Sequence, residues 1–486
     1  MIRVLCLEES FFYDIHSLVK AFYPGEDVKI HTDPEGEQMD YRIVLQPGRI
    51  TMTTSAVIPT VEKSCKLTAN ADRSEIKNEL KNLLYHVLSE VTGRQLPWGS
   101  MTGIRPTKIP MALLEEGKSD AEILAHMKET YLIGEEKSNL SLEIAKREHK
   151  LLSALHYENG YSLYIGIPFC PTTCLYCSFT SYPICSWEKR VGEYLTALEK
   201  EIDFVANMNR DKILDTVYIG GGTPTTLKPE ELDRLLGKIT SAFDMSHSLE
   251  FTVEAGRADS ITREKLQVLK KYGVTRISVN PQTMKQKTLD LIGRHHTVEQ
   301  VLETYQMARE EGFDNINMDI ILGLPEETED DVRHTMEVIS GLKPDSLTVH
   351  SLAIKRASRI HQWIEENGIQ TLKNTESTMQ LAEKAAREMG LVPYYLYRQK
   401  NMSGNLENVG YARDGKFGIY NILIMEEKQS IVALGAGTVS KAVFPGDKSR
   451  GGQSRIERCD TVKDVGLYIE KIDEMIERKR KLYEAY

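Results

Sequence analysis

The segment IPFCPTTCLYCSF, residues 167–179, places three cysteines within eight residues: Cys170, Cys174 and Cys177. Structural zinc sites usually take four ligands from two separated pairs. This chain has no second pair, although Cys185 follows eight residues later. Thiolates are the normal ligands of iron–sulfur clusters, and three of them would leave one iron of a 4Fe–4S cube without a protein ligand. Because an open metal position usually receives a substrate or cofactor, the spacing favours such a cluster over zinc.

The cysteine segment directly follows the first of six β-rich runs that alternate with amphipathic stretches. The runs, between residues 162 and 352, are SLYIGIPF, TVYIGG, EFTVEA, RISVN, NINMDIIL and SLTVHSL. Strand–helix units in series predict an α/β fold with a parallel sheet. Six units are fewer than the eight of a closed barrel, so we expect a partial (β/α)6 barrel. Ligands of such folds bind at the carboxyl ends of the strands, which is where the cysteines lie.

The flanking regions lack this alternation, and we expect three domains. Residues 1–155 predict an α+β domain of unassigned role, with a strand in MIRVLCL, a hairpin turning at Pro47–Gly48 and a helix in RSEIKNELKNLLYHVLSEV. Residues 156–355 form the core. Residues 356–486 predict an α+β extension on the substrate side, with a helix in STMQLAEKAAREMG, a strand near YNILIM, a glycine turn in LGAGT and one final charged helix.

Composition indicates an ordinary globular protein without a nucleic-acid partner. The 486 residues are 41% hydrophobic and 27% charged, which is enough for a sizeable core. A net charge of −10 does not favour DNA or RNA, whose binding needs a basic surface. We expect no membrane span, since no run approaches 18 apolar residues, and no signal peptide, since the segment MIRVLCLEES is too short and too charged for one. Three of the seven cysteines are clustered, which favours a reducing, cytoplasmic setting over a disulfide framework.

Glycine and acidic residues follow the second and third strands. The segment GGGTPT, residues 220–225, would let backbone groups approach a ligand closely. Glu254 ends the third strand, where a carboxylate is unusual unless it is paired or binds a ligand. It could accept hydrogen bonds from ribose hydroxyls. A salt bridge with Arg257 is the structural alternative.

Three more polar residues accompany the fourth and fifth strands. Gln282 and Arg294 follow the fourth strand, and Asp319 lies in the fifth. The planar guanidinium of Arg294 would suit a ligand carboxylate. A buried Arg294–Asp319 ion pair would explain both residues without a ligand.

Together these segments resemble the radical S-adenosylmethionine (SAM) enzymes, and among them the oxygen-independent coproporphyrinogen III oxidase (dehydrogenase) family, in its HemZ-like branch. The matching segments are YIGIPFCPTTCLYCSF, GGGTPT, VEAG, RISVNPQTMKQKTLDLIGRHH and NMDIILGLPEET. The resemblance implies a 4Fe–4S cluster on the three cysteines, with SAM on the open iron and a second SAM as an alternative. It also implies that SAM is contacted by Tyr164, Tyr176, Gly221, Gly222, Thr223, Glu254, Gln282, Arg294, Asp319 and Ala353.

The activity implied by this resemblance is conversion of two propionates of coproporphyrinogen III to vinyl groups, giving protoporphyrinogen IX. In that family an electron from the cluster splits SAM, and the 5′-deoxyadenosyl radical takes a hydrogen atom from the propionate carbon next to the ring. Loss of carbon dioxide and one electron then leaves the alkene. No side-chain acid or base is implied for the first step. A ferredoxin- or flavodoxin-type protein is the expected electron donor.

Three positions depart from the patterns of the family. The oxidases carry a further cysteine where this chain has Phe179, and a histidine often stands where it has Gly166. The haem-chaperone branch has a His-Asn pair where this chain has Tyr420–Asn421. Three alternatives therefore stay open: a haem chaperone that binds cluster and SAM without decarboxylase turnover, a radical SAM enzyme acting on another substrate, and a structural zinc protein.

The segment YYLYRQKN groups Tyr394, Tyr395 and Tyr397 with Arg398 and Lys400. Aromatic faces and cations would suit a tetrapyrrole, either coproporphyrinogen III or haem, with its carboxylate arms. A strand with a half-buried aromatic face explains the same pattern. If the first interpretation holds, Arg398→Ala should weaken tetrapyrrole binding and leave cluster content unchanged.

Overall fold

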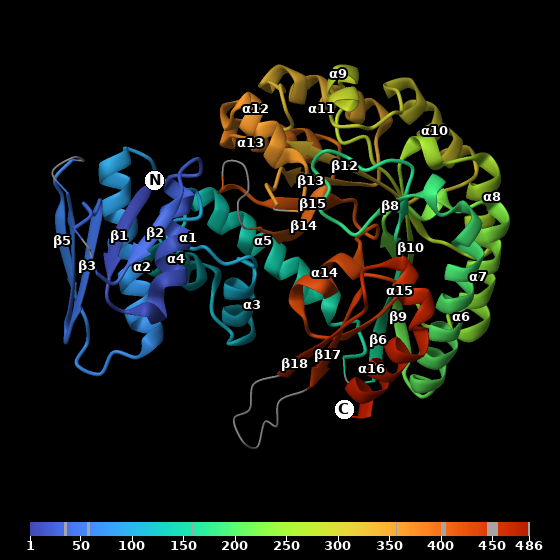
Figure 1. Ribbon diagram of the computed structural model, residues 1–486, viewed down its shortest axis with the longest axis horizontal. Helices are drawn as coiled ribbons and strands as arrows, with labels where there is room; N and C mark the ends of the chain where they lie inside the picture. The colour runs from blue at the N-terminus through green and yellow to red at the C-terminus, as the bar shows by residue number, and fades with distance from the viewer. Residues whose placement is uncertain are drawn as a thin grey trace. The chain divides into compact units, whose positions relative to one another are not determined.

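The computed structural model describes residues 1–33, 36–55, 59–157, 159–355, 357–399, 405–444 and 455–484 (Figure 1). The chain packs as two compact units. Unit 1 comprises Met1–Lys146 and Leu396–Glu407, and unit 2 comprises Arg147–Tyr395 and Asn408–Tyr486. These units follow spatial packing rather than the boundaries near residues 155 and 355, which stay a prediction. Within the described ranges, no helix combines the length and apolarity needed to cross a membrane.

Unit 1 is built on a mixed sheet whose described strands have the order β2-β1-β3-β4-β5. The predicted hairpin is confirmed, because β3 and β4 pair antiparallel on either side of Pro47–Gly48. Alternate residues of β3 are buried against α1 and α2, as expected for a strand with one face on the core. The strands are β1 (Ile2–Cys6), β2 (Val28–His31), β3 (Tyr41–Gln46), β4 (Arg49–Thr54) and β5 (Glu62–Lys66). The helices are α1 (Phe12–Phe22), α2 (Arg73–Thr92), α3 (Lys108–Glu115), α4 (Asp120–Tyr131) and the first part of α5 (Glu135–Leu152).

The segment 396–407 joins unit 1 through buried polar contacts. Glu407 is fully buried and accepts a hydrogen bond from Trp98 Nε1 at 2.7 Å. It also pairs with the Lys137 ammonium at 2.9 Å. A buried charge that loses its partner costs several kcal/mol. This pairing therefore anchors the segment 396–407 to the N-terminal part of the chain.

Unit 2 contains the barrel. Its described strands form one sheet in the order β14-β15-β13-β12-β11-β10-β9-β6-β16-β17-β18. Six neighbouring strands pair in parallel, in the spatial order β6-β9-β10-β11-β12-β13. This confirms the partial barrel and all six predicted core strands. These strands are β6 (Gly160–Ile167), β9 (Ile213–Gly221), β10 (Glu250–Gly256), β11 (Arg276–Val279), β12 (Ile316–Leu322) and β13 (Ser346–Ser351).

Helices line the outer side of this run of strands (Figure 1). Their apolar faces are buried against the sheet, whereas their charged faces point outward. The connecting helices are α6 (Val191–Met208), α7 (Pro229–Ala242), α8 (Arg263–Lys271), α9 (Gln286–Leu291), α10 (Val298–Glu310) and α11 (Glu329–Leu342).

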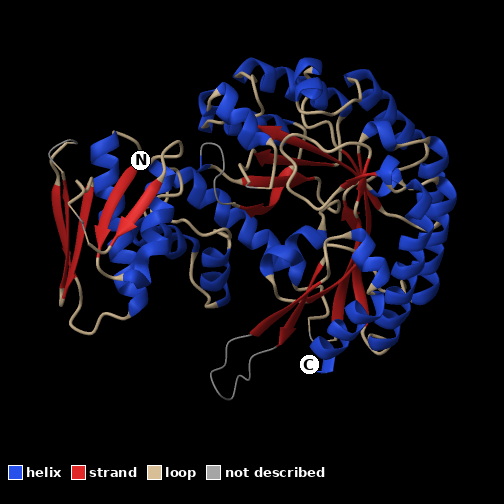
Figure 2. Cartoon of the chain, in the orientation of Figure 1, coloured by secondary structure: helices blue, strands red, loops and turns tan. Residues whose placement is uncertain are grey.

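The C-terminal region extends the barrel sheet at both edges (Figure 2). One addition is antiparallel, β15 on β13, and the other is parallel, β16 on β6. The strands are β14 (Val392–Tyr397), β15 (Asn408–Ala412), β16 (Ser430–Leu434), β17 (Val439–Phe444) and β18 (Arg455–Asp460). The helices are α12 (Ile360–Asn367), α13 (Glu376–Glu388), α14 (Ile419–Glu426), α15 (Val465–Glu470) and α16 (Ile472–Glu484).

Two predictions for this region are wrong. YNILIM is not a strand but most of α14, whose first turn is held by a buried carboxylate: Tyr420 N donates to Glu250 Oε2 at 3.1 Å. A short apolar run carries no periodicity that separates helix from strand, and this tertiary contact decides for the helix. The final charged helix is interrupted at Lys471 and forms two helices, α15 and α16.

Candidate functional site

The cysteine loop, residues 169–183, leaves the carboxyl end of β6. Pairing of β7 (Phe169–Cys170) with β8 (Tyr182–Pro183) closes it at its base. Burial raises the pKa of Cys170 to about 11, and the charges of Cys174 and Cys177 contribute to this rise. A hydrogen bond with a neighbouring threonine opposes the shift. The three thiols are therefore close enough to interact electrostatically.

Three thiols on one loop are a ligand set that suits an iron–sulfur cluster. Among the described residues, no three His, Cys, Asp or Glu side chains converge on a position for one metal ion. In a 4Fe–4S cube each thiolate binds a different iron, so the ligands surround a space instead of meeting at a point. Cys185 is exposed and lies beyond β8, after the loop has closed. The loop therefore offers three thiolates and leaves one corner of a cube open.

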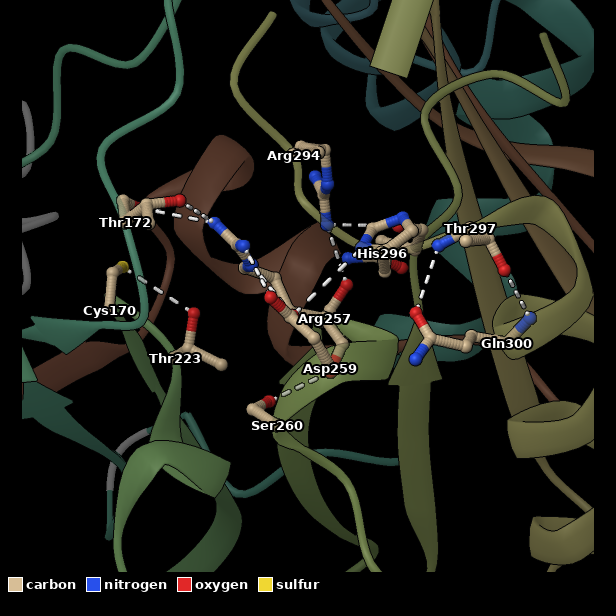
Figure 3. A network of polar contacts seen from close by, with 12 residues as sticks. Cys170, Thr172, Thr223, Arg257, Asp259, Ser260, Arg294, His296, Thr297 and Gln300 are labelled. Atoms are coloured by element: carbon tan, nitrogen blue, oxygen red, sulfur yellow. Dashed lines mark hydrogen bonds and ion pairs between the residues drawn. The ribbon is translucent and has the colours of Figure 1, made fainter. Parts of the chain in front are cut away.

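A buried arginine ties the cysteine loop to the end of β10 (Figure 3). Arg257 donates to Thr172 Oγ1 at 2.8 Å and to Thr172 O at 3.1 Å, and its Nη1 lies 3.9 Å from Cys174 Sγ. On its other edge it pairs with Asp259 at 2.6 Å. Burial alone would raise the pKa of Asp259, but His296 and Arg257 together lower it well below its ordinary value. The pair fixes the loop backbone and places a positive charge beside Cys174.

Arg257→Leu is expected to destabilise the protein by about 1–3 kcal/mol, because the hydrogen bonds to Thr172 and the ion pair with the partly exposed Asp259 are lost from a buried side chain. We also expect iron to be lost faster, since Thr172 loses its anchor. Urea unfolding and iron retention during dialysis measure the two effects. Arg263→Leu is the matched control, because its pairs with Glu310 and Glu311 lie on the outer side of α8; it should cost under about 1 kcal/mol. Equal effects of the two substitutions would contradict the anchoring role.

The glycine loop after β9 packs against the cysteine loop. Gly222 N and Thr223 N each donate to a carbonyl of the segment 167–169 at 2.7 Å. A Cβ on Gly222 would lie 2.5 Å from Phe169 O, and Gly221 has a φ of +105°. Thr223 Oγ1 lies 3.4 Å from Cys170 Sγ. The structure thus brings this loop to the thiols, and its glycines allow the close approach of the two backbones.

Glu254 lies near the end of β10 beside a stack of tyrosines. It accepts a hydrogen bond from Tyr218 at 2.5 Å, and Arg257 is engaged elsewhere, so the salt-bridge interpretation is wrong. The Tyr218 ring centroid is 6.1 Å from that of Tyr164 and 4.4 Å from that of Tyr420. Burial raises the pKa of Glu254 to about 7, although the Tyr218 hydrogen bond opposes this. This carboxyl therefore titrates near neutral pH.

Arg294 and Gln282 supply a buried donor and a buried acceptor at the same edge of the sheet. Arg294 donates to Tyr176 Oη at 3.0 Å and to the carbonyls of Gly256 and Asn280 at 2.9 and 3.0 Å. Within the described residues, Arg294 Nε and Gln282 Oε1 are buried without a hydrogen-bond partner. Buried polar groups are almost always paired. SAM carries both a carboxylate and an amine, so the residues present fit the amino-acid end of SAM.

Asp319 lies in β12 with polar neighbours of its own. It accepts from Asn317 Nδ2 at 2.7 Å and lies 3.8 Å from His350 Nε2. Burial alone would raise the pKa of Asp319, but His350 lowers it below the ordinary value. The guanidinium of Arg294 is directed elsewhere, so the buried Arg–Asp pair is wrong. Ala353 is half-buried on the loop after β13.

Arg398 is not a free cation. It is buried in unit 1, where it donates to Met101 O and to Asn405 Oδ1, each at 2.8 Å, and lies over the Trp98 ring at 5.6 Å. These contacts favour the structural interpretation of this residue. Lys400 lies outside the described residues.

Sequence reasoning gave no place in the site to several residues that the structure brings there. Arg257 was considered only as a salt-bridge partner of Glu254, although it follows directly on the carboxyl end of a core strand. Tyr420 had no signal, since its segment predicted a strand of the C-terminal extension. His350 lies in the last core strand, and Lys355 lies on the loop that follows it. The site residues that the sequence predicted lie in or after other core strands in the same way.

Comparisons with known proteins agree with this geometry. The Radical SAM superfamily model matches residues 164–339. The chain is 42% identical over 414 residues to the oxygen-independent coproporphyrinogen-III oxidase-like protein HemZ of Bacillus subtilis (strain 168), covering 84% of this chain and 81% of that one. It is 40% identical over 195 residues to the heme chaperone HemW of the same organism, covering 40% and 51%. Coproporphyrinogen III oxidase (HemN) from Escherichia coli has a similar fold, with a TM-score of 0.52 and 21% identity over 68% of this chain and 73% of that one.

A partial (β/α)6 barrel with three thiols on its first loop defines a radical SAM protein, a class that binds a 4Fe–4S cluster and SAM. Within that superfamily, the chain belongs to the family of the HemZ coproporphyrinogen oxidase-like proteins.

Proposed function

We propose that this protein catalyses the oxygen-independent oxidative decarboxylation of coproporphyrinogen III to protoporphyrinogen IX. The observation that supports the proposal is the loop with three thiols at the carboxyl end of β6, together with the buried Arg294 Nε and Gln282 Oε1, which lack hydrogen-bond partners among the described residues. When bound, the cluster and SAM supply a radical that removes a hydrogen atom from a propionate, after which carbon dioxide and one electron leave. A ferredoxin- or flavodoxin-type protein would supply the reducing electron. The seven cysteines, all described and all free thiols, suit a reducing cytoplasm.

The residues of this chain would hold and orient these groups and exclude water. Arg294 and Gln282 would hold the amino-acid end of SAM, and Glu254 would accept from its ribose hydroxyls. The neighbouring rings and loops would enclose the rest of SAM, whether one molecule binds or two. The full proposed set is Cys170, Cys174 and Cys177 for the cluster, and Tyr164, Tyr176, Gly221, Gly222, Thr223, Glu254, Gln282, Arg294, Asp319 and Ala353 for SAM.

An anaerobic turnover assay tests the proposal. The cluster is reconstituted, SAM, a reductant and coproporphyrinogen III are added, and the products are followed by mass spectrometry. We expect loss of one and then two carbon dioxide units, with deoxyadenosine formed in step. Deoxyadenosine formation without any change in the tetrapyrrole would overturn the substrate assignment.

Haem handling is the second candidate, because the heme chaperone HemW is a relative over 40% of this chain. In that case the protein would bind haem and pass it to a partner, with little SAM cleavage. Titration with haem and transfer to an apo-haemoprotein, in the absence of decarboxylation, would favour this candidate.

The raised pKa of Glu254 predicts that SAM binding depends on pH. The carboxylate form, which dominates above pH about 7, accepts hydroxyl hydrogen bonds more strongly than the neutral acid. We therefore expect SAM affinity to rise between pH about 6 and about 8, and Glu254→Gln to bind more weakly and to lose this rise. Equilibrium dialysis with labelled SAM, repeated across this pH range, measures the affinity of each variant.

Glu327→Gln is the matched control for this experiment. Burial also raises the pKa of Glu327 to about 7, but its carboxyl accepts from Thr283, whereas that of Glu254 accepts from Tyr218. The amine of SAM titrates equally in every variant, so only the difference between variants is informative. An unchanged pH profile in Glu254→Gln would contradict the ribose contact.

A further inference from the structure

The loop after β13 touches the cysteine loop at three points. Ile354 packs in one apolar cluster with Leu175 and Tyr176. Arg359 Nη2 donates to Thr173 O at 2.6 Å. Between these two contacts, the Lys355 ammonium lies 5.6 Å from the centre of the Phe179 ring. The last strand of the barrel therefore places a lysine on the rim of the loop that carries the three cysteines.

Phe179 is a large apolar side chain in an unusual place. Its side chain is 71% exposed, although it lies only two residues after Cys177. Burial raises the pKa of Cys177, and the backbone N–H of Phe179 opposes that shift through a hydrogen bond to the sulfur. Single exposed apolar residues are common on protein surfaces. This one is fixed at its backbone to a cluster ligand and turns its ring to the outside.

Lys355 is a half-buried cation for which the described residues supply no carboxylate partner. Its side chain makes no hydrogen bond or ion pair with them, and its neighbours are the Phe179 ring and the Cys177 sulfur. By contrast, the half-buried Lys285 of the same unit is paired with Asp331 at 2.9 Å. An anion brought beside this half-buried ammonium would offset the cost of its desolvation.

We propose that Phe179 and Lys355 form a subsite for one carboxylate-bearing arm of the tetrapyrrole. The ammonium pairs with the carboxylate, and the exposed ring packs against the macrocycle. This inference rests on the proposed function and adds which residues bind the substrate. It explains why the ring and the cation stay accessible together at the rim of the cluster loop.

A binding titration tests the subsite without turnover. The reconstituted protein with SAM is titrated anaerobically with coproporphyrin III and with its tetramethyl ester, which has the same macrocycle but no carboxylates. We expect Lys355→Met to weaken coproporphyrin III binding by about tenfold or more, as for loss of a charge-assisted contact, and to leave ester binding unchanged. Phe179→Ala should weaken both ligands. Lys384→Met is the matched control, because this lysine is 78% exposed on α13.

The outcomes separate the subsite from the proposed function. Unchanged coproporphyrin affinity in Lys355→Met, equal losses for acid and ester, or loss of iron in step with affinity would each overturn the subsite. Failure of the wild-type protein to bind either porphyrin would overturn it as well. Binding that depends on Lys355 would support the subsite even if no carbon dioxide were released. Turnover that Lys355→Met leaves unchanged would support the proposed function but not the subsite. Lys355→Arg should restore most of the affinity.

Discussion

Cys174→Ser is expected to abolish the cluster and reduce deoxyadenosine formation to background, while the protein stays folded. Cys174 is the buried member of the three thiols and lies closest to the Arg257 guanidinium. A hydroxyl does not replace a thiolate as a ligand of iron–sulfur clusters, and the change in side-chain volume is small. Iron and acid-labile sulfide per chain measure the first effect, and the thermal unfolding midpoint measures the last.

Cys185→Ser is the control that separates three ligands from four. Cys185 is exposed and lies beyond the closed end of the cysteine loop. We expect this substitution to leave iron content and deoxyadenosine formation unchanged. Cluster loss equal to that of Cys174→Ser would mean a fourth protein ligand, and no open iron for SAM.

Gly222→Ala is expected to damage the same site through the backbone. The added Cβ would lie 2.5 Å from Phe169 O and 2.9 Å from Ile167 O, so the strand that leads into Cys170 would have to shift. Overpacking of this kind typically costs about 1–3 kcal/mol. We expect a lower free energy of unfolding together with poor retention of iron.

Gly192→Ala is the matched control for this substitution. Gly192 lies in the first turn of α6, and a Cβ there would meet nothing within 4 Å. Alanine favours a helix over glycine, so stability should be unchanged or slightly higher and iron content should not change. Iron loss in both variants would show that the loss does not come from the close approach at Gly222, and iron retention in Gly222→Ala would contradict the role of this approach.

The barrel could be predicted from the sequence because its signals are local. Each core strand is a short apolar run followed by an amphipathic helix, and parallel strands gather their carboxyl ends at one edge. That rule alone placed Glu254 and Arg294 near the cysteines. The hydrogen-bond partners could not be predicted from the sequence. Glu254 and Asp259 are both close to Arg257 in the chain, and only the turn after β10 decides that Arg257 pairs with Asp259.

The C-terminal region was less predictable because its structure depends on distant contacts. α14 begins where Glu250, at the start of β10, accepts the Tyr420 N–H, and no local pattern reports a contact across 170 residues. The same holds for Arg398, whose aromatic setting suggested a substrate surface until its carbonyl partners in unit 1 were seen. Tertiary context overrode local propensity in both cases.

The central claim is that the three thiolates leave one iron of the cluster free for SAM. Electron–nuclear double resonance on the reduced, reconstituted protein tests it directly, with SAM labelled by ¹⁵N in its amino group and ¹⁷O in its carboxylate. We expect coupling of both labels to the cluster in the wild-type protein and in Cys185→Ser. A fully loaded cluster that shows no coupling to either label would contradict it.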